Sequence, residues 1–147
     1  MSQFKKLKIP QYAQIQDKET SESKFWRNYN ITKEEKHFSA PTSIHFDPSG
    51  SGLYAVTAST RVCLYDPLTD TIQRSFSRFH DDAYSGKFRR DGKLLIAGDK
   101  SGKVKVMDVV SKSIIRLLHA HTAPVHATNW SLDGLHMLSG SDDSSVK

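Results

Sequence analysis

The sequence of 147 residues contains a single cysteine, Cys63, so no disulfide bond can form within the chain. This favours a reducing compartment, the cytosol or the nucleus. No apolar run approaches the roughly 18 residues that a membrane-spanning helix needs. The lysine-rich N-terminus also lacks the apolar stretch of a secretory signal peptide. These absences predict a protein without a membrane partner.

Glycine is missing from residues 1–37, which are rich in Lys, Gln, Glu and Ser. They carry 8 Lys or Arg against 5 Asp or Glu, whereas residues 38–147 carry 13 against 11. Positive charge is therefore denser in the first segment. The net charge of the whole chain, +5, permits contact with nucleic acid without requiring it. We expect residues 1–37 to be an extension that docks, not an independent domain.

Within this extension, Thr20 or Ser21 is placed to cap a short helix that runs through Phe25, Trp26 and Tyr29. The spacing of the three aromatic residues lets them share one helical face. They are candidate anchors for a partner protein. Alternatively, they pin the extension to the flank of the chain's own main domain, and we slightly favour this second interpretation.

From residue 38 onward, short runs of strand-forming residues alternate with turn residues, and the pattern repeats every 42 residues. Aligning 88–105 with 130–147 gives five identities in 18 pairs, the last of them Lys105 with Lys147. In Lys103–Met107, valines and lysines alternate, so the valines face one way and the lysines the other. Two sets of positions follow the 42-residue step: Phe46, Phe88 and Trp130, and Val62, Val104 and Val146.

A period of about 40–45 residues with four strands per unit is typical of a β-propeller blade. We expect an all-β fold, a partial β-propeller of about two and a half four-stranded blades, at residues 38–79, 80–121 and 122–147. Closed propellers have at least about four blades, and open blade edges expose unpaired backbone groups. We therefore expect the isolated chain to be unstable or to associate.

The segment 130–147 resembles a WD repeat, with Trp130, an Asp-Gly turn and the run Leu-Ser-Gly-Ser-Asp-Asp at its second strand. In that family a blade carries a hydrogen-bonded set: a histidine before the first strand, Ser or Thr on the second, Asp in the next turn and Trp on the third. The resemblance assigns His121, Ser139 and Asp143 to this network in the third blade. In the second blade Phe79 and Ser101 occupy the histidine and aspartate positions, so we do not expect the network there.

A narrower resemblance is carried by 25–29, 54–62, 75–79 and 88–98, which are similar to the Utp-fifteen family of small-subunit processome subunits. The Ser-Arg-Phe sequence at 77–79 is unusual among WD repeats, so it is a fairly specific marker. The resemblance implies the N-terminal part of a seven-bladed WD-repeat propeller that is followed by a helical domain.

The same resemblance implies a nucleolar scaffold that acts in pre-ribosomal RNA processing and 18S rRNA maturation. Its partners would be other processome proteins, with contact to pre-ribosomal RNA or the U-three small nucleolar RNA particle. The alternative is a generic WD-repeat adaptor between proteins, without a role in RNA, because a fold does not by itself imply a function.

Surface residues at both ends of the predicted blades are candidate contacts with a partner or RNA. Basic side chains there are suited to phosphate, but we favour ordinary solvated charge as their explanation, because surface charge is common. The candidates are Arg61, Arg78 and Phe79 at one end and Arg89, Arg90 and Lys93 at the other.

Nothing in the sequence indicates an enzyme, because phosphate-binding glycine loops and a nucleophile elbow are both missing. His119, His121 and His126 suggest a metal site, but zinc needs about four converging ligands. Adjacent carboxylates such as Asp142 and Asp143 usually point apart and rarely share a substrate atom. We expect no catalytic residue, no metal, no cofactor and no small-molecule substrate.

Overall fold

The computed structural model describes residues 19–30 and 34–147, and it divides into two units, Met1–Glu35 and Lys36–Lys147. Of the extension expected at 1–37, residues 1–18 and 31–33 lie outside the described residues. Among the described residues, no helix combines the length and the apolar character that crossing a membrane requires.

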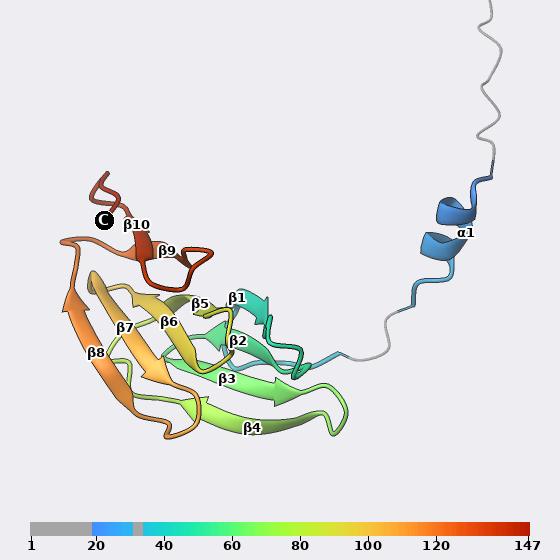
Figure 1. Cartoon of the computed structure of the whole chain (residues 1–147), viewed down its shortest axis with the longest axis horizontal. Helices are drawn as coiled ribbons and strands as arrows, with labels where there is room; N and C mark the ends of the chain where they lie inside the picture. The colour runs from blue at the N-terminus through green and yellow to red at the C-terminus, as the bar shows by residue number, and fades with distance from the viewer. Residues whose placement is uncertain (1–18, 31–33) are drawn as a thin grey trace, which may run out of the picture. The chain divides into compact units, whose positions relative to one another are not determined.

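The first unit contains one short helix, α1 (Ser21–Arg27) (Figure 1). Thr20 is its N-cap, and its Oγ1 accepts a hydrogen bond from Ser23 N at 3.1 Å, which satisfies one of the free amides of the first turn. The helix ends at Arg27, so the expectation that it runs through Tyr29 is wrong. Asn28, the C-cap, leaves helical geometry and turns its amide toward the carbonyls of Phe25 and Trp26.

The second unit is built from three antiparallel sheets, each with its strands in sequence order (Figure 1). The first sheet holds β1 (Pro41–Phe46), β2 (Tyr54–Ala58), β3 (Arg61–Asp66) and β4 (Thr71–Phe76). The second holds β5 (Ala83–Phe88), β6 (Leu94–Asp99), β7 (Lys103–Asp108) and β8 (Ile114–His119). The third holds β9 (Val125–Trp130) and β10 (Met137–Ser141). This confirms the prediction of an all-β fold that forms part of a β-propeller.

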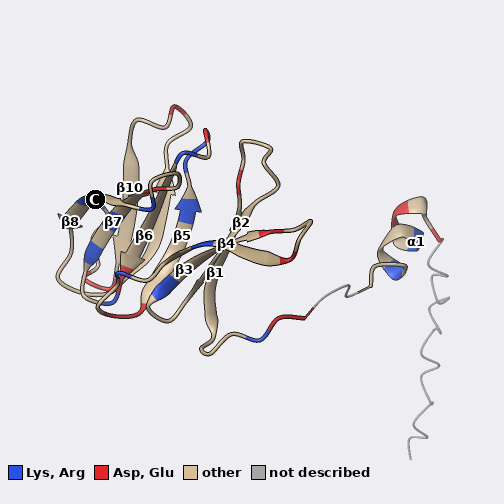
Figure 2. Cartoon of the chain, turned by 90° about the horizontal axis from the view of Figure 1, so that it is seen from below, with Lys and Arg blue, Asp and Glu red and all other residues tan. Residues whose placement is uncertain are grey.

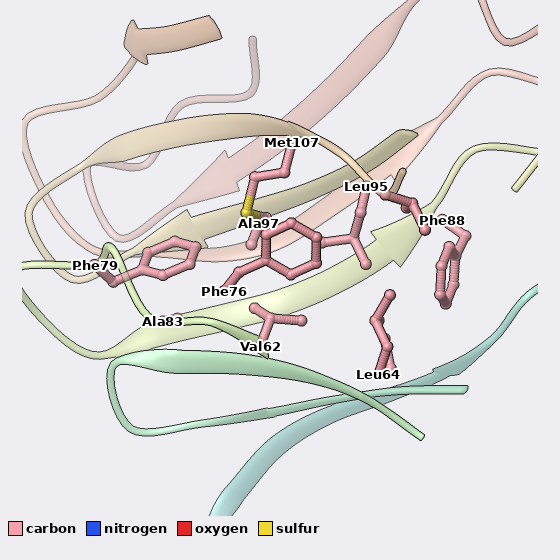
Figure 3. Close-up of a cluster of buried hydrophobic side chains, with 11 residues drawn as sticks. Val62, Leu64, Phe76, Phe79, Ala83, Phe88, Leu95, Ala97 and Met107 are labelled. Carbon is pink, nitrogen blue, oxygen red and sulfur yellow. The ribbon is translucent and has the colours of Figure 1, made fainter. Parts of the chain in front are cut away.

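The hydrophobic core lies between the first and second sheets (Figure 3). Leu64 on β3 and Leu95 and Met107 on β6 and β7 are fully buried there. A four-stranded sheet cannot bury both of its faces alone, so each sheet depends on its neighbours. Consistent with this, Ile44 on β1 and Leu138 on β10 remain largely exposed.

Inner strands of neighbouring sheets are also joined by buried polar contacts, and a bulge in β5 supplies two of them. Ser85 adopts a φ of 48°, and the register of β5 shifts around it. The bulge directs Gly86 N to the side chain of Thr57 in the first sheet, at 3.0 Å. Ser85 O accepts a hydrogen bond from Thr128 Oγ1 in the third sheet, at 2.8 Å. Strand β5 is therefore hydrogen-bonded to both the first and the third sheet.

Candidate functional site

The third sheet brings His121, Ser139 and Asp143 together, as the WD resemblance implies. The His121 ring is fully buried, with Nδ1 2.9 Å from Asp143 Oδ2 and Nε2 2.9 Å from Ser139 Oγ. Because an ionised carboxylate only accepts hydrogen bonds, Nδ1 donates to Asp143. In the neutral ring Nε2 then accepts from the Ser139 hydroxyl. The chain linking the second and third sheets is thus tied to β10 and to the turn that follows it.

Asp143 accepts hydrogen bonds from Thr122 and Ser145 as well as from the His121 ring. Its Oδ1 accepts from Ser145 N and Ser145 Oγ, and its Oδ2 accepts from Thr122 N at 3.2 Å. The Ser145 hydroxyl contributes most to holding the pKa of Asp143 well below its usual range, and His121 and the amides of Thr122 and Ser145 add to the effect. The carboxylate therefore stays ionised at neutral pH and fixes the orientation of the imidazole.

The second sheet uses a different arrangement at the equivalent positions. Phe79 replaces the histidine, and the ammonium of Lys105 lies 4.1 Å from the centroid of its ring. Lys105 is buried, and its Nζ also donates to Arg78 O at 2.7 Å and lies 3.9 Å from Asp99 Oδ2. Burial lowers the pKa of Lys105, while Asp99 opposes this effect. A cation over an aromatic ring thus takes the place of the histidine network.

The lysine contact recurs in the third sheet, and reasoning from the sequence missed it. Lys147 Nζ donates to Ala120 O at 2.6 Å, which is the Lys105–Arg78 contact displaced by 42 residues at both ends. The signal was present as the identity of Lys105 and Lys147 in the repeat. Lys105 ties β7 to the loop before β5, and Lys147, which lies outside the named strands, makes the equivalent contact with the loop before β9.

His45 on β1 forms a further contact between sheets, and its protonation state matters. Its Nδ1 accepts a hydrogen bond from Phe88 N on β5 at 3.2 Å, which requires that nitrogen to be unprotonated. Burial, helped by the positive charge of Lys87, holds the pKa of His45 below its ordinary value, and Asp47 weakly opposes this. The folded state therefore favours neutral His45.

We expect His45 to make the stability of the chain fall in mild acid. A histidine whose pKa is lowered on folding stabilises fully above its ordinary pKa of about 6.5, and this stabilisation is lost as the pH falls below it. Urea midpoints at pH 7.5 and 5.5 should differ more for the unmodified chain than for His45→Asn, whose amide oxygen accepts without titrating. Equal pH dependence in both proteins would contradict this role.

The basic candidates differ in their exposure and in the contacts that they already form. Arg61 and Arg78 are exposed at one end of the sheets, and Arg90 and Lys93 at the other. Arg89 is less available, because it forms two hydrogen bonds with Asp91 and lies over the Trp130 ring. In the view of Figure 2, segments of Lys or Arg and segments of Asp or Glu are interspersed along the ribbon.

Phe79 differs from the basic candidates because it lies mostly in the core. Only 6% of it is exposed, and it packs in the core with Phe76 and Met107 beneath Lys105. It therefore supports the loop around Arg78, and its contact with a partner or RNA stays a prediction.

The aromatic residues of the first unit remain exposed and contact one another. The rings of Phe25 and Trp26 lie 5.3 Å apart edge to face, and those of Trp26 and Tyr29 lie 5.7 Å apart. Each of the three is more than half exposed. Tyr29 reaches this cluster from the residues after α1, not from the helix face.

The histidines considered as metal ligands have separate roles. His121 is held by Ser139 and Asp143, whereas the exposed His126 pairs with Asp142 at 2.9 Å. Within residues 19–30 and 34–147, no three His, Cys, Asp or Glu side chains form a group able to hold a metal ion. The two adjacent aspartates thus serve two different histidines.

Comparison with known proteins gives two findings. The family model described as WD domain, G-beta repeat, matches residues 112–147. The chain is also 41% identical over 143 residues to U3 small nucleolar RNA-associated protein 15 of Schizosaccharomyces pombe, which covers 97% of the chain and 29% of that relative.

Two further relatives carry the same name. The homolog of Xenopus laevis is 40% identical over the whole chain and 28% of its own length. The protein of Saccharomyces cerevisiae is 39% identical over 84% of the chain and 25% of its own length. The chain thus spans less than a third of the length of each of these relatives.

Proposed function

We propose that this chain, a WD-repeat protein related to U3 small nucleolar RNA-associated protein 15, is part of a non-catalytic scaffold subunit of the small-subunit processome. The observation that carries the proposal is the 41% identity over 97% of the chain to a protein of that name. The proposed role is in pre-ribosomal RNA processing, including 18S rRNA maturation, in the nucleolus. The proposed partners are other processome proteins and the U3 small nucleolar RNA particle.

The geometry of the second unit supports a binding role. Its buried polar groups tie strands and loops together: His121 holds β10, Lys105 holds the loop at Arg78, and Thr57 holds β5. Such fixed sheets present their loops and turns rigidly at both ends, which suits a surface for partners. Arg61, Arg90 and Lys93 are the exposed cations that we propose as contacts with RNA or protein.

We also propose that residues 38–79, 80–121 and 122–147 are successive blades, with residues 1–37 as an extension. In support, each of the three sheets has all of its strands inside a single one of these ranges. The exposed cluster of Phe25, Trp26 and Tyr29 suits an anchor that becomes buried against a protein surface.

The function is tested by purifying the endogenous gene product that carries this chain, tagged in place, and measuring the RNA that accompanies it. We expect U3 small nucleolar RNA to be enriched at least tenfold over a small nucleolar RNA that only guides modification. Mass spectrometry of the same eluate should find processome proteins. A stable set of partner proteins without U3 RNA would instead support the generic adaptor.

A further inference from the structure

A small cavity lies where the end of β4 meets the hairpin of β7 and β8. Its volume is about 200 Å³. Two sheets contribute to it: Ser75, Phe76, Ser77, Arg78 and Phe79 from the first side, and Met107, Lys112 and Ile114 from the second. The sequence that sets this chain apart from ordinary WD repeats, Ser-Arg-Phe, therefore forms one wall of a cavity.

The floor of the cavity is apolar and held in place. Phe76, Phe79 and Met107 are almost completely buried and pack against one another (Figure 3). The Lys105 ammonium holds this wall in place, because it lies over the Phe79 ring and donates a hydrogen bond to Arg78 O. The cavity is thus formed before any ligand arrives, which reduces the ordering cost of binding.

The rim of the cavity is positively charged. The side chains of Arg78 and Lys112 are exposed, and neither forms an ion pair with another described residue. Among the described residues that line the cavity, none is acidic. The nearby Asp108 turns its carboxylate to the amides of Val110 and Ser111. The cavity therefore combines an apolar floor with cations that lack a counter-charge.

We propose that this cavity binds a short acidic peptide segment of a partner protein. One aliphatic side chain of the peptide enters the cavity and contacts its floor. Carboxylates beside that side chain form hydrogen-bonded ion pairs with Arg78 and Lys112 at the rim. The cavity is smaller than the roughly 300–1,000 Å³ of sites for drug-sized molecules, so it suits a single side chain. The inference goes beyond the proposed function and does not depend on it.

An RNA ligand fits this cavity less well. Single-stranded RNA binds aromatic side chains whose ring faces are open for stacking. Here Phe76 and Phe79 are about 95% buried, and Lys105 covers one face of Phe79. Phosphate contacts with Arg78 and Lys112 alone would leave the apolar floor unused.

The test uses the full chain and five fluorescein-labelled heptapeptides, each with three glutamates on either side of a central Leu, Ile, Val, Met or Phe. Fluorescence anisotropy should show saturable binding of at least one peptide. Replacing its central residue by glycine should weaken binding at least fivefold. The double variant Arg78→Glu with Lys112→Glu should weaken it at least tenfold, since both side chains are exposed and their replacement leaves the core intact.

The matched control is Lys100→Glu with Arg116→Glu, which makes the same charge change at two exposed residues of the second unit that do not line the cavity. It should change peptide affinity less than twofold. Binding of none of the five peptides, or an equal loss in both double variants, would overturn the proposal. A labelled uridine decamer provides the last outcome. If it binds more tightly than every peptide, and if only Arg78→Glu with Lys112→Glu abolishes this binding, the cavity is an RNA site and the proposal is overturned.

Discussion

Gly98→Ala is expected to lower the free energy of unfolding by about 3 kcal/mol, the upper part of the range for overpacked cores. A β-carbon at Gly98 would lie 2.6 Å from Val125 O and 2.7 Å from Val125 Cβ. Non-bonded carbon atoms normally stay about 3.5–4.0 Å apart. Val125 begins β9 and is fully buried, so its backbone cannot retreat without moving the third sheet away from the second.

The repeat supplies a matched control in Gly140, which follows Gly98 by 42 residues. A β-carbon there would lie 3.9 Å from Ala127 Cβ, an ordinary contact. We expect Gly140→Ala to change the free energy of unfolding by no more than about 0.5 kcal/mol. Urea unfolding followed by circular dichroism measures both variants. Similar losses in the two would show that the packing of β6 against β9 is not what restricts Gly98.

The contrast between these two glycines shows what the sequence does and does not contain. The 42-residue step predicts the strands and the turns, because both follow from residues that are neighbours along the chain. It also marks Gly98 and Gly140 as equivalent. It does not say that only Gly98 has another sheet against it, because that contact joins residues of different sheets.

For the charged residue Lys105, too, the sequence predicts the strand but not the contact with a neighbouring segment. Alternation along β7 places the two lysines opposite the two valines, but it does not reveal what covers each face. In the structure Lys105 is buried against Phe79, since the neighbouring loop covers it. Resemblance to the WD family was sufficient for the histidine network, whose members recur at fixed places. The cavity beside Arg78 was not predictable, because its two walls come from sheets whose distance no local pattern encodes.

His121→Ala is the second change for which we expect a large effect, a loss of about 3 kcal/mol. Removal of the ring takes away the closest hydrogen-bond partner of the buried Ser139 hydroxyl and one of the two hydrogen bonds that Asp143 Oδ2 accepts. Each buried polar group that loses its partner costs about 1–3 kcal/mol. The loss should be visible as a lower urea midpoint with an unchanged slope, because the surface exposed on unfolding stays the same.

His126→Ala is the control, since His126 Nε2 and Asp142 Oδ2 are also 2.9 Å apart. The two histidines have the same partner type at the same distance and differ in burial: the His121 side chain is 0% exposed and that of His126 is 52% exposed. An exposed pair of polar side chains contributes about 0–1 kcal/mol, because water replaces the contact when it is lost. We therefore expect His126→Ala to cost less than about 1 kcal/mol. Equal losses in the two variants would mean that the distance between the paired atoms, and not their burial, determines the free energy that each pair contributes. They would also mean that the network at His121 does not anchor the third sheet.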